Sequence, residues 1–165
     1  MKFSHHIIPV CVLLCAFSMA HAELPNSKIT EVKEYLTAEG YVTRPWAKGF
    51  DDFYGCSTTY KELGSGDVLA NNIAYYVSGN QTTATELKLV LNVNVKAKAN
   101  DAHGEFLKIA QALYLKATGK KLEDKLVEAF TKGSSSEIAA KSYTTKLVRS
   151  DWPTGRGYEL KFIIE

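Results

Sequence analysis

Cysteine and histidine are scarce in this 165-residue chain, and most of them lie in its first 22 residues. Two of the three cysteines, Cys11 and Cys15, fall there, so only Cys56 belongs to the rest of the chain. A single cysteine cannot form an internal disulfide, which excludes the class of small exported domains held together by disulfides. Three interpretations of Cys56 follow: a small hydrophobic residue of the core, an intermolecular disulfide, or a reactive thiol.

The first 22 residues have the features of a signal peptide. Lys2 gives a positive start, Ile7 to Ala20 is an apolar run, and Ala20-His21-Ala22 carries the small residues that signal peptidase recognises. The run is short for a bilayer span, so a retained membrane anchor is the less favoured interpretation. We therefore expect cleavage of residues 1–22, a single domain over residues 23–165, a periplasmic or secreted location, and no stable membrane span after cleavage.

Beyond the predicted signal peptide His103 is the only histidine, which limits the chemistry that the chain can perform. One histidine and one cysteine cannot supply a usual zinc ligand set, so we predict no metal site. Cys56 and His103 form the only candidate Cys-His pair, and the chain has no Gly-x-Ser-x-Gly elbow. We expect His103 to be an exposed residue in the first turn of a helix.

Two further motifs have simple interpretations. Asp51-Asp52 lies among aromatic residues, as carboxylates of glycosidases do, but neighbouring residues of an extended segment point to opposite sides and cannot flank one bond. Gly64-Ser65-Gly66 precedes a predicted strand, whereas phosphate-binding loops precede a helix, so we predict a hairpin turn. No catalytic, cofactor-binding or metal-binding residue is predicted, and an enzyme is not expected.

Charge gives no indication of a nucleic-acid partner. The formal net charge is +2. The densest basic group contains acidic residues as well, and its members are Lys116, Lys120, Lys121 and Lys125 with Glu123, Asp124 and Glu128. Mixed charges of this kind are typical of a solvated helix face, so we predict no nucleic-acid binding.

Strict alternation predicts a central strand over Glu86 to Lys96. The apolar residues Leu87, Leu89, Leu91, Val93 and Val95 alternate there with mostly polar neighbours. Four other stretches also favour strands, from their alternation or their β-branched and aromatic residues: Phe53 to Leu63, Val68 to Val77, Tyr143 to Trp152 and Tyr158 to Ile164. Short connections between the first three strands imply antiparallel pairing.

Apolar residues at spacings of three and four predict three helices. The first begins near Ile29 and ends at Gly40, the second is capped by Asn100 or Asp101 and ends at Gly119, and the third ends at Gly133. The resulting order α-β-β-β-α-α-β-β predicts an α+β domain with an antiparallel five-stranded sheet and helices packed on one face. The last strand ends beside the C-terminus, and we expect it to be an open edge.

Aromatic residues supply the only indication of function. Aromatic residues and arginine dominate the binding energy of many protein interfaces. Six residues are predicted to bind a partner: Trp46, Tyr54, Tyr76, Arg149, Trp152 and Arg156. The alternative interpretation of Trp152 is that it folds back to cap the core.

We therefore expect an exported, non-catalytic domain that binds a protein partner, of the inhibitor or immunity type. The alternative is a carrier of a lipid or an aromatic molecule, with an apolar cleft between the sheet and the helices from Asn100 to Gly133. No cofactor is predicted. We expect a monomer, or a homodimer formed through Cys56 or an edge strand.

Overall fold

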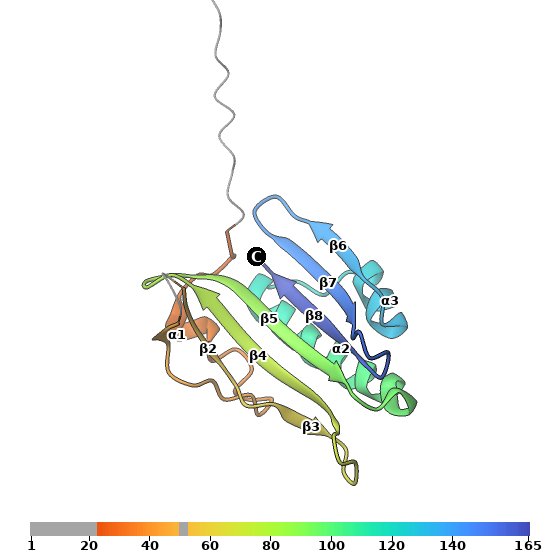
Figure 1. Cartoon of the computed structure of the whole chain (residues 1–165). Coiled ribbons are helices and arrows are strands. Elements are labelled where there is room, and N and C mark those ends of the chain that lie inside the picture. The colour runs from red at the N-terminus through yellow and green to blue at the C-terminus, as the bar shows by residue number, and fades with distance from the viewer. Residues whose placement is uncertain (1–22, 50–52) are drawn as a thin grey trace, which may run out of the picture.

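The computed structural model describes residues 23–49 and 53–165, which form a mixed α+β fold around one antiparallel sheet (Figure 1). The predicted signal peptide and the Asp51-Asp52 pair lie outside the described residues. The sheet has eight strands: β1 (Ala47–Lys48), β2 (Tyr54–Ser57), β3 (Lys61–Leu63), β4 (Asn71–Gly79), β5 (Ala84–Val93), β6 (Ser136–Ala139), β7 (Thr144–Asp151) and β8 (Tyr158–Ile164). The helices are α1 (Ile29–Val32), α2 (Ala99–Thr118) and α3 (Asp124–Lys132), and a 3-10 turn (Lys96–Lys98) precedes α2.

The prediction of five strands is wrong, because the sheet order is β1-β2-β4-β5-β8-β7-β6 with β3 also paired to β4. The stretch predicted as one strand from Phe53 to Leu63 is divided into β2 and β3. Thr58 lies between them, and its hydroxyl accepts a hydrogen bond from the Tyr75 N–H at 3.0 Å. The other additional strands, β1 and β6, are short edge strands without a clear alternation of apolar residues, so periodicity did not indicate them.

The central strand is where alternation predicted it. β5 pairs with β4 on one side and with β8 on the other. Leu87, Leu89, Leu91 and Val93 are completely buried on one face of β5. The alternating side chains of a strand point to opposite faces of the sheet, and this face forms the floor of the hydrophobic core.

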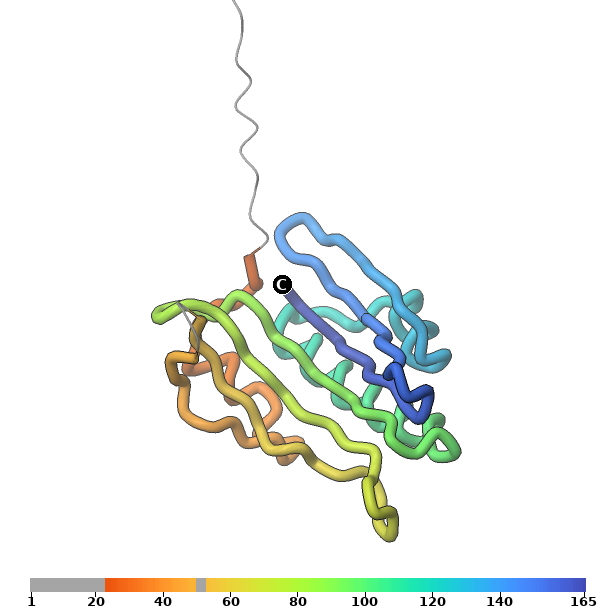
Figure 2. Tube along the Cα trace, viewed as in Figure 1, coloured from red at the N-terminus to blue at the C-terminus, as the bar shows by residue number. Residues whose placement is uncertain are grey.

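The prediction that the C-terminal strand is an open edge is wrong. β8 lies between β5 and β7, and Phe162 faces Leu89 of the one and Leu147 of the other. Within the described sheet, β1 and β6 are the outermost strands. Figure 2 shows the blue C-terminal strand inside the sheet, with the orange N-terminal segment and the light blue β6 at opposite sides.

Aromatic rings fill the space between the longer helices and the sheet. The Phe106 ring of α2 lies 5.2 Å from that of Phe130 in α3, which in turn lies 5.3 Å from Phe162 of β8. Figure 1 shows α2 passing behind the strands. These rings occupy the region where an apolar cleft for a carried ligand was expected.

The helix ends are also where glycines predicted them. Gly119 follows α2 with φ 70° and Gly133 follows α3 with φ 60°, the left-handed conformation that commonly ends a helix. The first helix is shorter than predicted, because α1 ends at Val32 and a series of turns continues to Gly40. Across residues 23–49 and 53–165, no helix has the length and apolar character needed to cross a membrane.

Candidate functional site

The structure separates the six residues predicted to bind a partner into two groups. Tyr54 lies on β2 and Tyr76 on β4, and Trp46 directly precedes β1 at the same side of the sheet. Arg149, Trp152 and Arg156 belong to the β7–β8 hairpin. β5 and β8 lie between β4 and β7, so the two groups do not form one patch.

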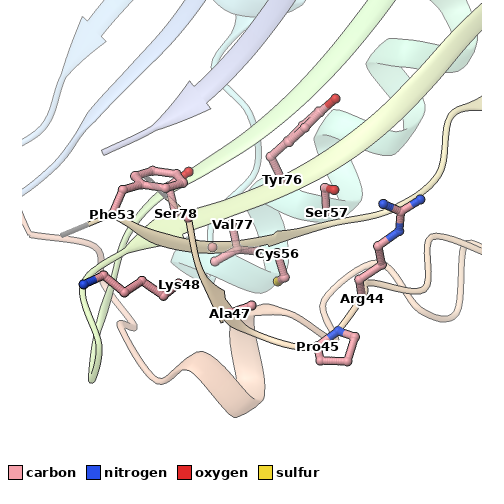
Figure 3. A pocket seen from close by; sticks show the side chains of 12 residues that line it. Arg44, Pro45, Ala47, Lys48, Phe53, Cys56, Ser57, Tyr76, Val77 and Ser78 are labelled. Atoms are coloured by element: carbon pink, nitrogen blue, oxygen red, sulfur yellow. The ribbon is translucent and has the colours of Figure 1, made fainter. Parts of the chain in front are cut away.

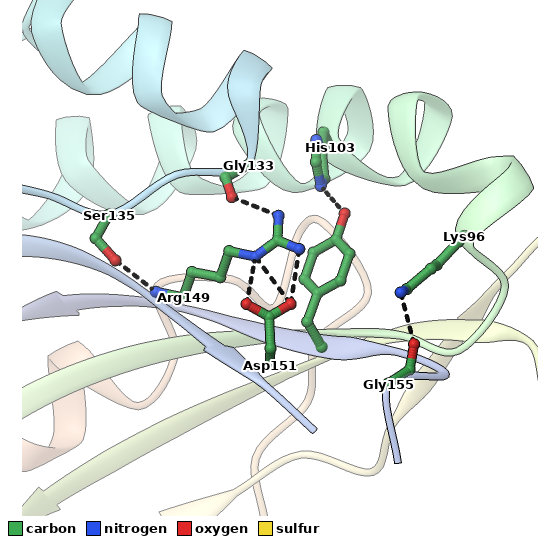
Figure 4. A network of polar contacts seen from close by, with 8 residues as sticks. Lys96, His103, Gly133, Ser135, Arg149, Asp151 and Gly155 are labelled. Carbon is green, nitrogen blue, oxygen red and sulfur yellow. Dashed lines mark hydrogen bonds and ion pairs between the residues drawn. The ribbon is translucent and has the colours of Figure 1, made fainter. Parts of the chain in front are cut away.

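The Arg149 side chain makes its hydrogen bonds to other residues of the same chain. Its guanidinium donates hydrogen bonds to the Asp151 carboxylate, the shortest at 2.8 Å, and to the Gly133 carbonyl at 3.0 Å (Figure 4). The same group lies 3.7 Å from the centre of the Tyr158 ring. The hydrogen bond from Arg149 also lowers the pKa of Asp151. Arg149 therefore connects β7, β8 and the end of α3.

The prediction that His103 is exposed is wrong. Only 5% of the residue is exposed, and its Nε2 lies 2.7 Å from the Tyr158 hydroxyl (Figure 4). Burial lowers the pKa of His103, the backbone of Thr131 opposes this, and the charge of Arg149 lowers the pKa further. Nδ1 of His103 is buried and has no hydrogen-bond partner with acceptable geometry among the described residues. Spacing could have indicated this burial, because His103 stands three residues before Phe106, on the apolar face of α2.

The structure does not bring Cys56 and His103, the only candidate Cys-His pair, together. Cys56 is a buried free cysteine on β2, and burial raises the pKa of its thiol. His103 instead contacts β8, which β4 and β5 separate from β2. Cys56 therefore fits the first of its three interpretations, a small residue at the edge of the core.

Both tryptophans are directed partly into the protein. Trp46 packs against the core, and its Nε1 is buried without a hydrogen bond to any described residue. The Trp152 ring lies against Gly157, where a Cβ atom would collide with it. Trp152 thus folds back over its own hairpin, whereas Arg156 is exposed at the tip.

A hollow of about 310 Å³ opens at the β1–β2–β4 side of the sheet, and we call it the aromatic hollow (Figure 3). Its lining residues come from three segments, 44–49, 53–57 and 76–78. Of the six residues predicted to bind a partner, Tyr76 is the one that lines it. Phe53, which the prediction omitted, also lines it and is 52% exposed.

Backbone contacts shape the aromatic hollow. The Arg44 N–H donates a hydrogen bond to the Ser57 carbonyl at 2.9 Å, which holds the chain before β1 beside β2. A Cβ atom at Gly55 would lie 2.8 Å from the Val77 carbonyl and 3.3 Å from the Phe53 ring. A glycine at position 55 therefore keeps space open between these two residues.

Tyr76, which lines the hollow, contacts two side chains outside the lining. The Tyr76 hydroxyl donates a hydrogen bond to that of Tyr60 at 2.8 Å, and Lys88 lies 5.6 Å from the centre of the Tyr76 ring. Burial raises the pKa of Tyr76, and the hydrogen bond with Tyr60 raises it further. The Arg44 side chain makes no hydrogen bond or ion pair with residues 23–49 or 53–165. These groups suit non-covalent recognition, because aromatic surface and arginine supply contact area and directed hydrogen bonds.

Metal binding has no obvious location in the described ranges, 23–49 and 53–165, where no cluster of three or more His, Cys, Asp or Glu side chains could hold an ion. Comparison of the chain with known protein families, with curated proteins and with solved structures found no match.

Proposed function

We propose that residues 23–165 form an exported, non-catalytic domain that binds a protein partner, of the inhibitor or immunity type, through the aromatic hollow. In this proposal residues 1–22 direct export and are removed, and the domain acts in the periplasm or outside the cell as a monomer or homodimer. In this proposal the helices pack on one face of the sheet and leave the aromatic hollow accessible.

The observation that carries the proposal is the exposed apolar side chain of Phe53 at an accessible hollow. Three of the six exposed large hydrophobic residues of the described chain, Val42, Phe53 and Tyr60, lie between positions 42 and 60, and the other three are Val68, Leu69 and Leu115. Phe53 lines the aromatic hollow, Tyr60 is hydrogen-bonded to the lining residue Tyr76, and Val42 is two residues before Arg44. Exposed apolar surface gathered around a hollow is typical of interaction sites, whereas single exposed residues are ordinary.

Affinity capture with a matched pair of variants tests this proposal. The full chain carries a C-terminal tag, and proteins of the source organism that bind the exported product are identified by mass spectrometry. Phe53→Ser removes an aromatic side chain that is 52% exposed, and Leu115→Ser removes an apolar side chain of α2 that is 53% exposed. We expect a specific partner to be captured by the wild type and by Leu115→Ser, and to be lost with Phe53→Ser.

The carrier alternative is decided by a native mass spectrum of the protein purified from the exported fraction. The protein-binding proposal expects a bare monomer or dimer mass, or the mass of a complex with another protein. A reproducible excess of a few hundred daltons would replace the proposal with the carrier alternative. Equal capture by Phe53→Ser and by the wild type would reject the aromatic hollow as the binding surface.

A further inference from the structure

We infer that the aromatic hollow receives an acidic segment of the partner protein, with a carboxylate on Arg44 and an apolar or aromatic side chain against Phe53. This inference rests on the proposed function and adds the chemistry of the partner. It follows from the Arg44 guanidinium, which makes no ion pair with a described residue, from its position opposite Phe53, and from the size of the hollow.

The cationic group that carries the inference is Arg44, which lines the hollow. Nearby lysines differ from Arg44, because Lys33 lies 3.1 Å from Glu34 and Lys88 lies 3.0 Å from Glu86. The Arg44 guanidinium has no such carboxylate among the described residues. An incoming carboxylate would therefore meet an arginine that does not first have to break an ion pair.

Arginine suits this role for geometric reasons. Its planar guanidinium presents parallel N–H donors that match the two oxygens of a carboxylate. Figure 3 shows Arg44 and Phe53 at opposite ends of the hollow, with Cys56 and Val77 between them. A segment that places a carboxylate at one end can therefore lay an apolar side chain along the rest of the hollow.

The size and the overall charge favour a protein segment over larger anionic ligands. About 310 Å³ is near the lower limit for a small-molecule site and has room for one or two side chains. Nucleic acids bind through many phosphate contacts spread over a basic surface. The whole chain has a formal net charge of only +2, which gives no indication of such a surface. An acidic peptide segment is small enough for the hollow and needs only one cationic group to bind its carboxylate.

Two synthetic peptides of equal size test the inference. Acetyl-Gly-Glu-Phe-Glu-Gly-amide carries two carboxylates, and acetyl-Gly-Gln-Phe-Gln-Gly-amide replaces them with neutral amides. Each is titrated into the 15N-labelled protein, obtained by export of the full chain, while the backbone amide signals of Gly55, Ser57 and Ser78 are followed by NMR. We expect the acidic peptide to shift these signals and to bind about tenfold more tightly than the neutral peptide does. This factor is the effect of one charge-assisted hydrogen bond. Added salt should reduce this difference.

Arginine variants identify the group responsible. Arg44→Gln should reduce binding of the acidic peptide to the level of the neutral one. Arg156→Gln removes the same charge from the exposed hairpin tip and should leave binding unchanged. Equal binding of the two peptides, or unchanged binding by Arg44→Gln, would overturn the inference.

Two other outcomes separate this inference from the proposed function. A captured partner that is lost with Phe53→Ser but kept by Arg44→Gln would leave protein binding intact and overturn the acidic occupant. Phenylacetate, which has the same two chemical groups, is the small-molecule control. If it binds as tightly as the acidic peptide while the neutral peptide does not, the hollow recognises small aromatic acids, and both the protein segment and the proposed function are rejected.

Discussion

Substitution of Gly133 by alanine should destabilise the protein far more than the equivalent change at Gly119. Both glycines end a helix in the left-handed conformation, with φ 60° at Gly133 and φ 70° at Gly119. Their surroundings differ. A Cβ atom at Gly133 would lie 2.9 Å from Nε2 of His103 and closer still to Cε1, whereas at Gly119 no described atom lies within 4 Å.

The expected magnitudes follow from two contributions. An alanine in the left-handed region costs about 1–2 kcal/mol, and the smaller entropy of the unfolded chain returns about 0.4–1 kcal/mol, so Gly119→Ala should cost about 1 kcal/mol. Gly133→Ala adds the collision with a buried ring, and overpacking of this kind costs about 1–3 kcal/mol more. The His103 ring has little freedom to move, because Nε2 is bonded to Tyr158 and the residue is buried.

Urea unfolding of both variants and of the wild type measures this difference. With a slope of about 2 kcal/mol per molar urea, an extra 2 kcal/mol lowers the midpoint of Gly133→Ala by about 1 M relative to Gly119→Ala. In a His103→Ala background the ring is absent, so Gly133→Ala should cost no more than Gly119→Ala does. Equal midpoints for the two single variants, or an excess cost that persists without His103, would refute the reasoning.

Three further predictions concern pH, packing and the thiol. Burial lowers the pKa of His103, so the unfolded chain binds a proton at this residue more readily than the folded protein does. The free energy of unfolding should therefore decrease as pH falls from 7.5 through the ordinary histidine range near 6.5, and His103→Gln should flatten this dependence. A wild type equally stable at pH 5 and 7.5 would contradict the prediction. Phe130→Ala removes a ring packed between Phe106 and Phe162 and should cost about 3–5 kcal/mol in urea unfolding, whereas the exposed Leu115→Ala should change stability by less than about 0.5 kcal/mol. Cys56, buried and with a raised pKa, should react with a thiol reagent at least about tenfold more slowly in the native protein than in urea, and equal rates would show that the thiol is accessible.

Residue type indicated one residue that lines the aromatic hollow. Tyr76 was predicted to bind a partner because tyrosine recurs in protein interfaces, and the structure places it in the lining, while its binding of a partner stays a prediction. Arg149 and Trp152 were identified for the same reason, but one is bound to Asp151 and the other lies on Gly157. Residue type alone cannot distinguish a side chain that is available to a partner from one whose contacts lie within the same chain.

The amino-acid sequence by itself determined the α+β class, the central strand β5 and the ends of α2 and α3. These features depend on local signals, namely an apolar residue at every second position and a glycine that adopts a left-handed conformation at little cost. Local signals of this kind act over a few residues, so they can be recognised without knowledge of the remaining chain.

Only the tertiary structure decided the strand order, the burial of His103 and the position of the aromatic hollow. β8 is the last strand in the sequence, yet it pairs with β5, and Leu87 faces Ile164, which lies 77 residues later in the chain. The hollow likewise joins residues 44–49 to residues 76–78. Such pairings depend on the burial of whole helix and sheet faces against one another. A single long-range contact does not offset the entropy lost on closing the loop between its residues, so these contacts form only when the entire core assembles.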